Sequence, residues 1–242
     1  MARFCLLMYS EFHTGRTYVS AVPADNLMRF ENKEIHFRPA FSPDHLIKSN
    51  IRVFSERKPS GLSFSDEVNI GFSEISSLLC SAFSPEGKTS VRRPYPSAGA
   101  QYPIEIFLCR LSENITDWPS DSNGYHYLPI SRGIESTGSV NINSLYKALS
   151  GGDPVRLGKP HFALVYFMVY EKALFKYRYR GYRMAMMEVG SMYQVAGMVA
   201  DRLGLENRVW SAFTDTYVSK ILNVDIRTAT PLIIQFFGKR ND

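Results

Sequence analysis

Cysteine is rare in this chain, with three residues among 242, and no two of them form a Cys-x-x-Cys pair. Cys5, Cys80 and Cys109 are odd in number and far apart, a usage that argues against a disulfide framework and indicates reduced thiols. A chain of this length also buries enough surface to fold without a disulfide or a structural metal. We therefore expect a cytoplasmic protein.

Metal-binding and nucleotide-binding patterns are missing as well. The five histidines never fall at metal-ligand spacing, and no His-Glu-x-x-His motif exists, so we expect no metal site. No Gly-x-Gly-x-x-Gly follows a predicted strand, which argues against a Rossmann nucleotide site. The phosphate-loop letters at 82–89 follow a predicted helix instead of a strand, and Ser55-x-x-Lys58 lacks the other motifs of acyl-enzyme serines.

Long apolar runs and a strong charge of one sign are absent. No run approaches the roughly 20 apolar residues of a membrane helix, and 28 Lys and Arg against 23 Asp and Glu give a net charge of only +5. The densest basic stretch, 172–183, alternates cations with tyrosines, as segments that hold single-stranded nucleic acid do. Because it is short and isolated, a phosphate-bearing cofactor or a peptide partner explains it equally well. We expect no nucleic-acid or membrane partner.

The chain is long enough for one large domain with a peripheral extension. Pro23, Pro39 and Pro43 break any periodicity in the first fifty residues, so we expect 1–50 to be an N-terminal arm or partner-binding extension and 51–242 to be one folded domain.

Hydrophobic periodicity within 51–242 predicts a mixed α+β fold. The predicted strands lie at 104–111, 125–128, 161–170 and 231–237, and the predicted helices at 73–84, 143–149, 184–203 and 215–223. Ser73 is the expected cap of the first helix. The longest helix, 184–203, carries only Glu188, Asp201 and Arg202 as charged residues, so we expect it to be buried almost all round.

A proline-rich loop at 92–103 precedes the first predicted strand. Its prolines, Pro96 among them, fix φ and remove backbone donors, while the small residues 98–100 let another group approach the main chain. The remaining N–H groups, the Ser97 hydroxyl and the Gln101 amide can point at a polar ring edge or an anion. A rigid connecting loop without a ligand explains the same composition.

Two motifs in this order resemble a known family. The pattern R-x-Y-P-S-x-G-A-x-Y-P-x-E at 93–105, followed by K-Y-R-x-R-G-Y-R at 176–183, is similar to the nitroreductase-like, FMN-dependent azoline dehydrogenases of the type found in microcin B17 synthetases. Shorter matches, such as 19–23, 157–161 and 231–233, extend the resemblance over most of the chain. It implies a nitroreductase-like fold, a central mixed or antiparallel sheet flanked by helices, with FMN at a homodimer interface.

The resemblance also implies a reaction and partners. Thiazolines and oxazolines in a ribosomally made precursor peptide are oxidised to thiazoles and oxazoles after a separate cyclodehydratase, with YcaO-type and E1-like subunits, has formed the rings. The hydride goes to FMN and the proton to a base. The resemblance also implies that the product is an azole-containing peptide antibiotic of the bacteriocin type. The expected partners are the precursor peptide, the cyclodehydratase subunits and a second copy of the chain.

Site residues follow from the same resemblance. Lys176 and Tyr177 match the pair on which the family depends, and either can be the base: a neighbouring cation favours ionisation of a phenol, and a desolvated lysine is itself a competent base. The loop with Pro96, Ser97, Gly99 and Gln101 matches the cofactor loop. For the FMN phosphate, we expect Arg57 with Ser60 first, because arginine binds phosphate bidentately, and Lys239 second.

Two other functions use the same fold. A stand-alone nitro or quinone reductase would take electrons from NAD(P)H, so bleaching of the bound flavin by NAD(P)H would distinguish it. A non-catalytic scaffold subunit of the cyclodehydratase complex would purify without the flavin colour.

Overall fold

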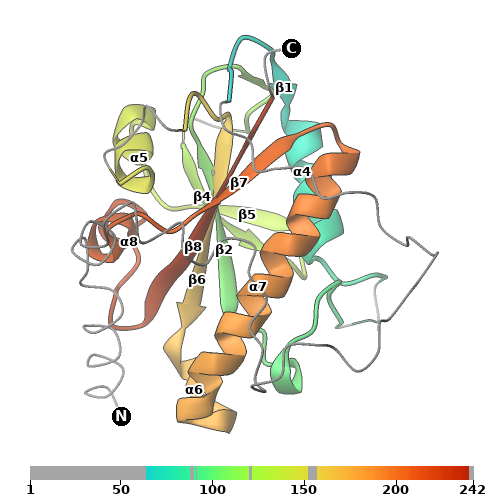
Figure 1. The fold of residues 1–242 in the computed structure, drawn as a ribbon, viewed down its shortest axis with the longest axis vertical. Coiled ribbons are helices and arrows are strands. Elements are labelled where there is room, and N and C mark those ends of the chain that lie inside the picture. Colours follow the sequence, from blue (N-terminus) through green and yellow to red (C-terminus); the bar gives the residue numbers. More distant parts are fainter. Residues whose placement is uncertain (1–63, 88–89, 91, 120–121, 152–156, 240–242) are drawn as a thin grey trace, which may run out of the picture. The chain divides into compact units, whose positions relative to one another are not determined.

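The computed structural model describes residues 64–87, 90, 92–119, 122–151 and 157–239 (Figure 1). These residues all belong to one compact unit, Ser60–Asp242. The predicted arm at 1–50 and the predicted phosphate ligands Arg57 and Ser60 lie outside the described residues, so they stay predictions. Among the described residues, no helix combines the length and the apolar character that crossing a membrane requires.

A six-stranded antiparallel sheet forms the centre of this unit. In spatial order its strands are β5 (Gly133–Ser136), β4 (Gly124–Leu128), β2 (Ile104–Arg110), β6 (Phe162–Val169), β8 (Ala229–Gly238) and β7 (Glu206–Trp210). The continuous apolar run of β6 places it in the middle, between β2 and β8, which confirms the predicted central strand. A smaller parallel pair joins β1 (Ile70–Gly71) to β3 (Ile115–Thr116).

Helices cover both faces of the sheet (Figure 1). Along β6, the side chains of Leu164 and Tyr166 belong to one buried cluster with helices α4 (Phe72–Phe83) and α7 (Tyr179–Arg202). The side chains of Val165 and Phe167 belong to the other cluster, with α5 (Ile142–Leu149) and α8 (Asp215–Ile221). Because successive strand residues point to opposite faces, one apolar strand fills both clusters. The predicted α+β class with a helix-flanked sheet is confirmed.

The predicted cap of the first helix is wrong. Helix α4 begins at Phe72 with Gly71 as its N-cap, so Ser73 already lies inside the first turn. The Glu74 carboxylate accepts a hydrogen bond of 3.0 Å from the Gly71 N–H, which satisfies one of the amides that a helix start leaves without a partner.

Helix α7 is the longest helix of the described residues, but its expected burial on all sides is wrong for the single chain. Only the side facing the sheet is buried, while Met186, Met187 and Met198 are 42–55% exposed. A helix lying on a sheet buries one stripe, so these apolar side chains are left on the outer face.

Candidate functional site

The predicted cofactor loop and the predicted catalytic pair meet in the folded chain. Gly99 lies in a short 3₁₀ turn, Ala98–Ala100, with a φ of 59°. A β-carbon placed on Gly99 would lie 2.8 Å from the Tyr177 hydroxyl and 2.9 Å from Lys176 Nζ. Both groups therefore reach the main chain of the loop, and a side chain at residue 99 would have to displace them.

Lys176 and Tyr177 form the last two residues of a helix that the sequence did not predict, α6 (Tyr170–Tyr177). Tyr177 is half-buried and Lys176 is exposed. The Lys176 Nζ atom lies 5.5 Å from the centre of the Tyr177 ring, so a positive charge stands beside the phenol. This arrangement can hold or move a proton at the Tyr177 hydroxyl.

A sharp corner at Arg178 separates α6 from α7 and fixes the position of this pair. Arg178 has a φ of 48° and a ψ of −129°, a sparsely populated conformation for a residue with a side chain. Across the corner, a β-carbon on Gly181 would lie 1.8 Å from the Ala173 carbonyl oxygen, so the two helix backbones touch there. The corner is therefore closely packed around a glycine.

Hydrogen bonds inside the loop hold its shape. The Tyr102 N–H donates to Ser97 Oγ at 2.9 Å, and Gln101 Nε2 donates to the Gly99 carbonyl at 2.9 Å. The N–H groups of Ala98 and Gly99 begin the 3₁₀ turn, where the turn itself supplies no acceptor. The amide of Gln101 thus braces the loop, while the two main-chain N–H groups are the donors that a ligand would find.

Arg93 and two tyrosines support the loop from its N-terminal side. Arg93 Nη1 donates to the Tyr95 hydroxyl at 2.9 Å, and the guanidinium lies 4.3 Å from the centre of the Tyr102 ring. Burial raises the pKa of the Tyr95 hydroxyl, and Arg93 opposes that shift only in part. Tyr95 therefore stays neutral and serves as a hydrogen-bonding partner of Arg93.

Glu188 brings a buried carboxyl group from α7 to the same loop. Its side chain is 3% exposed, and its Oε1 atom has no hydrogen-bond partner. Burial raises the pKa of Glu188 to about 7, against the opposing effects of the nearby Ser97 hydroxyl, Arg93 and Lys172. No role for Glu188 was predicted from the sequence, although a lone acid in an apolar helix is the signal that could have identified it.

A charged cluster anchors α6 to the sheet. The Glu105 carboxylate lies 3.0 Å from His126 Nε2 and binds Lys172 Nζ through its other oxygen, while Glu135 is 3.6 Å from His126 Nδ1. The hydrogen bond to Glu105 raises the pKa of His126, and burial opposes this. Burial favours a higher pKa for Glu105, but His126 and Lys172 outweigh it and lower the pKa. This cluster holds the helix that carries Lys176 and Tyr177.

Lys239 lies away from the loop. Its Nζ atom is 3.3 Å from Glu74 Oε1 and donates to the Gly204 carbonyl at 3.2 Å, beyond the C-terminal end of α7. At 1.5 Å per residue, the helix from Glu188 to Arg202 alone spans about 21 Å. Lys239 therefore does not join Ser97 and Gly99 within one chain, and its phosphate-binding role stays a prediction. Among the described residues, no three His, Cys, Asp or Glu side chains form a metal-binding group.

Comparisons with known proteins agree with this geometry. No protein-family model matches the chain. It is 59% identical over 227 residues to the microcin B17-processing protein McbC of Escherichia coli, covering 94% of this chain and 84% of that protein. Its structure matches a chain of the E. coli microcin synthetase McbBCD complex, solved with truncated pro-MccB17 bound, with a TM-score of 0.94 and 54% identity, over all of this chain and 93% of that chain. A solved nitroreductase-like protein from Ralstonia eutropha shares the fold alone, with a TM-score of 0.63 and 15% identity over 87% of this chain and 97% of that chain. On this identity over most of its length, the chain belongs to the family of the microcin B17-processing protein McbC, with a nitroreductase-like fold.

Proposed function

We propose that this chain is an FMN-dependent azoline dehydrogenase that oxidises thiazolines and oxazolines of a microcin B17-like precursor peptide to thiazoles and oxazoles. The observation that carries the proposal is the contact of Gly99 with the Tyr177 hydroxyl and Lys176 Nζ, in a chain of the McbC family. This contact joins the predicted cofactor loop to the predicted catalytic pair, so one heterocycle can lie against both.

The residues around the loop suit the polar edge of a flavin ring. That edge presents carbonyl oxygens and an N–H group, so it needs both donors and acceptors. The N–H groups of Ala98 and Gly99 are donors without a partner in their own turn. The Oε1 atom of Glu188 is a buried acceptor without a hydrogen bond. We propose Pro96, Ser97, Gly99 and Gln101 as the cofactor loop, with Arg57, Ser60 and Lys239 as phosphate ligands.

The chain supplies proton transfer and positioning for the oxidation. FMN, when bound, supplies the acceptor for the hydride that leaves the azoline ring. Tyr177 acts as a phenolate, whose negative charge the Lys176 cation beside it stabilises. Its oxygen accepts the proton released from the neighbouring ring carbon and so returns to the neutral hydroxyl. The loop holds the reacting ring in place through its own rigid turn. The ring thus loses one hydride and one proton and becomes aromatic.

We propose that the chain works within a synthetase complex. The related E. coli protein is part of the McbBCD complex with pro-MccB17 bound. By analogy, the partners of this chain are a precursor peptide and cyclodehydratase subunits. The exposed methionines on α7 supply an apolar face for a second copy, as a homodimer requires. The unpaired thiols of Cys80 and Cys109 are consistent with a cytoplasmic location.

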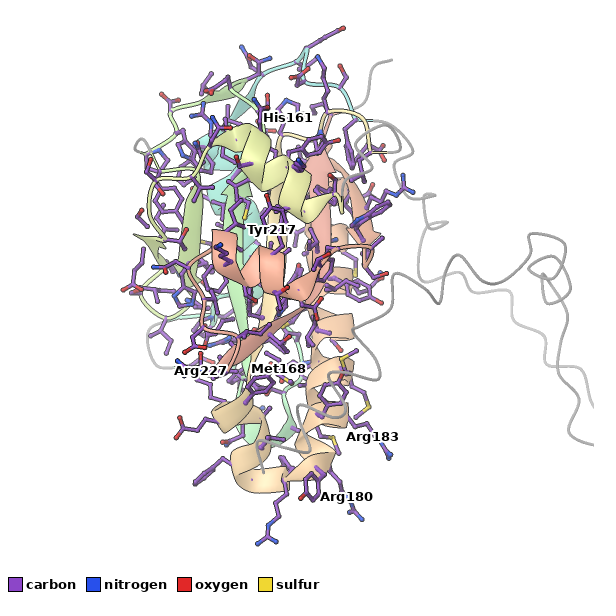
Figure 2. All side chains as sticks on the ribbon, turned by 90° about the vertical axis from the view of Figure 1, so that its left-hand side faces the viewer. His161, Met168, Arg180, Arg183, Tyr217 and Arg227 are labelled. Atoms are coloured by element: carbon purple, nitrogen blue, oxygen red, sulfur yellow. The ribbon has the colours of Figure 1, made fainter. Side chains whose placement is uncertain are left out.

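Replacing Tyr177 by Phe tests the proposal. The variant keeps the ring and loses only the hydroxyl, so we expect FMN to stay bound while azole formation falls by at least about 100-fold. Mass spectrometry of the peptide, which loses about 2 Da for each azoline oxidised, measures the rate. Tyr217→Phe on α8, an exposed tyrosine away from the loop (Figure 2), is the matched control and should keep full activity. A fully active Tyr177→Phe enzyme would contradict the assignment.

A further inference from the structure

Helix α6, which carries Lys176 and Tyr177, has few apolar contacts of its own. Of its eight residues only Ala173 is fully buried, and no side chain caps its first turn at the N-cap, Val169. A helix of this length is not stable by itself, so contacts with the rest of the fold must determine where it lies. The packing of Gly181 against Ala173 ties α6 to α7, but this contact does not connect it to the cofactor loop.

Two contacts connect the start of α6 to the strand that follows the cofactor loop. The Val169 N–H donates to the Pro103 carbonyl at 2.9 Å, at the entry to the helix. In the first turn, the Lys172 ammonium is bound to the Glu105 carboxylate of β2. Lys172 lies one turn, about 6 Å, before Lys176 on the same side of the helix. The two contacts therefore bridge the segment that leaves the loop and the helix that carries the catalytic pair.

The Glu105 carboxylate is also held from its other side. His126 Nε2, on β4, lies 3.0 Å from Glu105 Oε2, whereas Lys172 binds Oε1. The His126 ring is itself stacked on Phe107, with the ring centres 5.0 Å apart. The side chain of Glu105 is only 17% exposed. Strands β2 and β4 therefore present a fixed carboxylate to Lys172, whose long side chain would otherwise have many conformations.

Stability alone does not account for this ion pair. Lys172 is 47% exposed, and an ion pair with such an exposed partner adds little to the free energy of folding. Its effect on position is larger, because a shift of α6 along the sheet would move Lys172 away from a carboxylate that two strands hold in place. The same shift would separate Tyr177 and Lys176 from Gly99, the contact that carries the proposed function.

We propose that Glu105 is a positioning residue, which sets the distance between the cofactor loop and Tyr177 by holding Lys172. His126 supports it by fixing the Glu105 carboxylate. The proposal rests on the proposed function, because it takes this distance as one that the reaction needs. It assigns neither Glu105 nor Lys172 a contact with the reacting ring.

Lys172→Met tests the proposal, because it keeps most of the side chain and removes the charge that Glu105 binds. In the full chain with FMN bound, kcat for azole formation should fall about tenfold, while KM for the azoline peptide changes by less than about twofold. Lys172→Arg keeps the charge and should restore at least about half of the parent kcat.

Lys159→Met is the matched control. It also breaks an ion pair between a lysine and a carboxylate, since Lys159 Nζ lies 3.3 Å from Asp66 Oδ1. Lys159 precedes the start of β6, whereas α6 follows the end of that strand, so the two lysines lie at opposite ends of β6. Lys159→Met should therefore keep the parent kcat.

Glu105→Gln removes the same ion pair from the strand side and keeps the shape of the side chain. Combined with Lys172→Met it gives a double-mutant cycle, in which the two losses of kcat should not add. The double variant should be within about twofold of Lys172→Met, and additive losses would overturn the inference. Glu105→Gln also provides the test if Lys172→Met does not fold.

Hydrogen exchange of the amides in 171–177 measures the attachment of α6 without turnover. Exchange should be faster in Lys172→Met than in the parent chain and in Lys159→Met. An unchanged exchange rate would overturn the inference, as would faster exchange with the parent kcat. Faster exchange in Lys172→Met together with a parent chain that forms no azole would overturn the proposed function, while the hold of Glu105 on α6 would stand.

Discussion

The two halves of helix α7 differ in the buried polar group that each contributes or contacts. The first half contains Glu188, which is ionisable and has one carboxyl oxygen without a hydrogen-bond partner. Beside the second half lies Gln235, whose Nε2 donates to the Tyr193 carbonyl at 3.1 Å and to Asn207 Oδ1 at 2.9 Å, while Tyr166 donates to its Oε1 at 2.8 Å. A neutral, fully bonded network stabilises one arrangement of the core, whereas a partly bonded carboxyl group weakens it. The half of the helix with the satisfied network is thus distinct from the half that lies at the proposed site.

The cations at the two ends of α7 also differ, because Lys239 at the C-terminal end has an ion-pair partner and those at the N-terminal end do not, among the described residues. Lys239 closes the C-terminal end by binding Glu74 and the Gly204 carbonyl. At the N-terminal end, Arg180 and Arg183 project into solvent (Figure 2), and among the described residues neither they nor Arg178 form an ion pair. Cations at a helix N-terminus oppose the helix dipole, which favours negative charge there. The end of the helix at the proposed site is again the end whose charges do not favour stability.

Breaking the satisfied network should have the largest effect on stability. Gln235→Leu leaves the Tyr166 hydroxyl, the Tyr193 carbonyl and the Asn207 side chain without their partner. We expect the free energy of unfolding to fall by about 2–4 kcal/mol at every pH. Chemical denaturation of the parent and variant chains measures this. A loss that depends on pH would show that the network is not neutral, as the comparison requires.

Removing the charge from the other half should stabilise the chain. Because the folded-state pKa of Glu188 is raised from 4.5 to about 7, its contribution to stability is full below 4.5 and is lost as the pH rises through 7. Glu188→Gln has no such loss, so we expect it to exceed the parent by about 2 kcal/mol above pH 7 and to match it at low pH. Denaturation curves at both pH values give the difference. A variant less stable than the parent above pH 7 would contradict the cost assigned to this carboxyl group.

A methyl group on Gly99 should affect activity more than stability. Gly99→Ala strains a residue with a φ of 59° by about 1 kcal/mol and pushes against the Tyr177 hydroxyl and Lys176 Nζ. We expect azole formation to fall by at least about tenfold. Gly87→Ala is the matched control, since Gly87 also has a positive φ, 76°, but nothing lies within 4 Å of its β-carbon position. Equal activity in the two variants would show that the contact at Gly99 is not needed.

Local patterns predicted the elements that are long or continuously apolar. The strand β6, the helix α5 and the C-terminal part of α7 follow from periodicity, because burial on a face or on both faces leaves a regular signature. The break between α6 and α7 could not be predicted. Arg178 is neither glycine nor proline, and its unusual backbone depends on the close packing of Gly181 against Ala173, which is a tertiary contact.

The composition of the site was predictable only in part. The loop showed its donors in the sequence, and the resemblance supplied Lys176 and Tyr177. Their meeting with Gly99 depends on how β2 and β6 pair, which brings the two segments to the same end of the sheet. The pairing of Lys239 with Glu74 links residues from opposite ends of the described chain, so local sequence patterns carried no sign of it.

The contact at Gly181 also offers a way to read other sequences. A β-carbon there would lie 1.8 Å from the Ala173 carbonyl oxygen, so no residue other than glycine can occupy this place unless the two helices move apart. A homologue with alanine or serine at the equivalent position must therefore have rebuilt the bend that carries its lysine and tyrosine. The residue at the position of Gly181 thus distinguishes homologues that keep this bend between the two helices from homologues that have a different one.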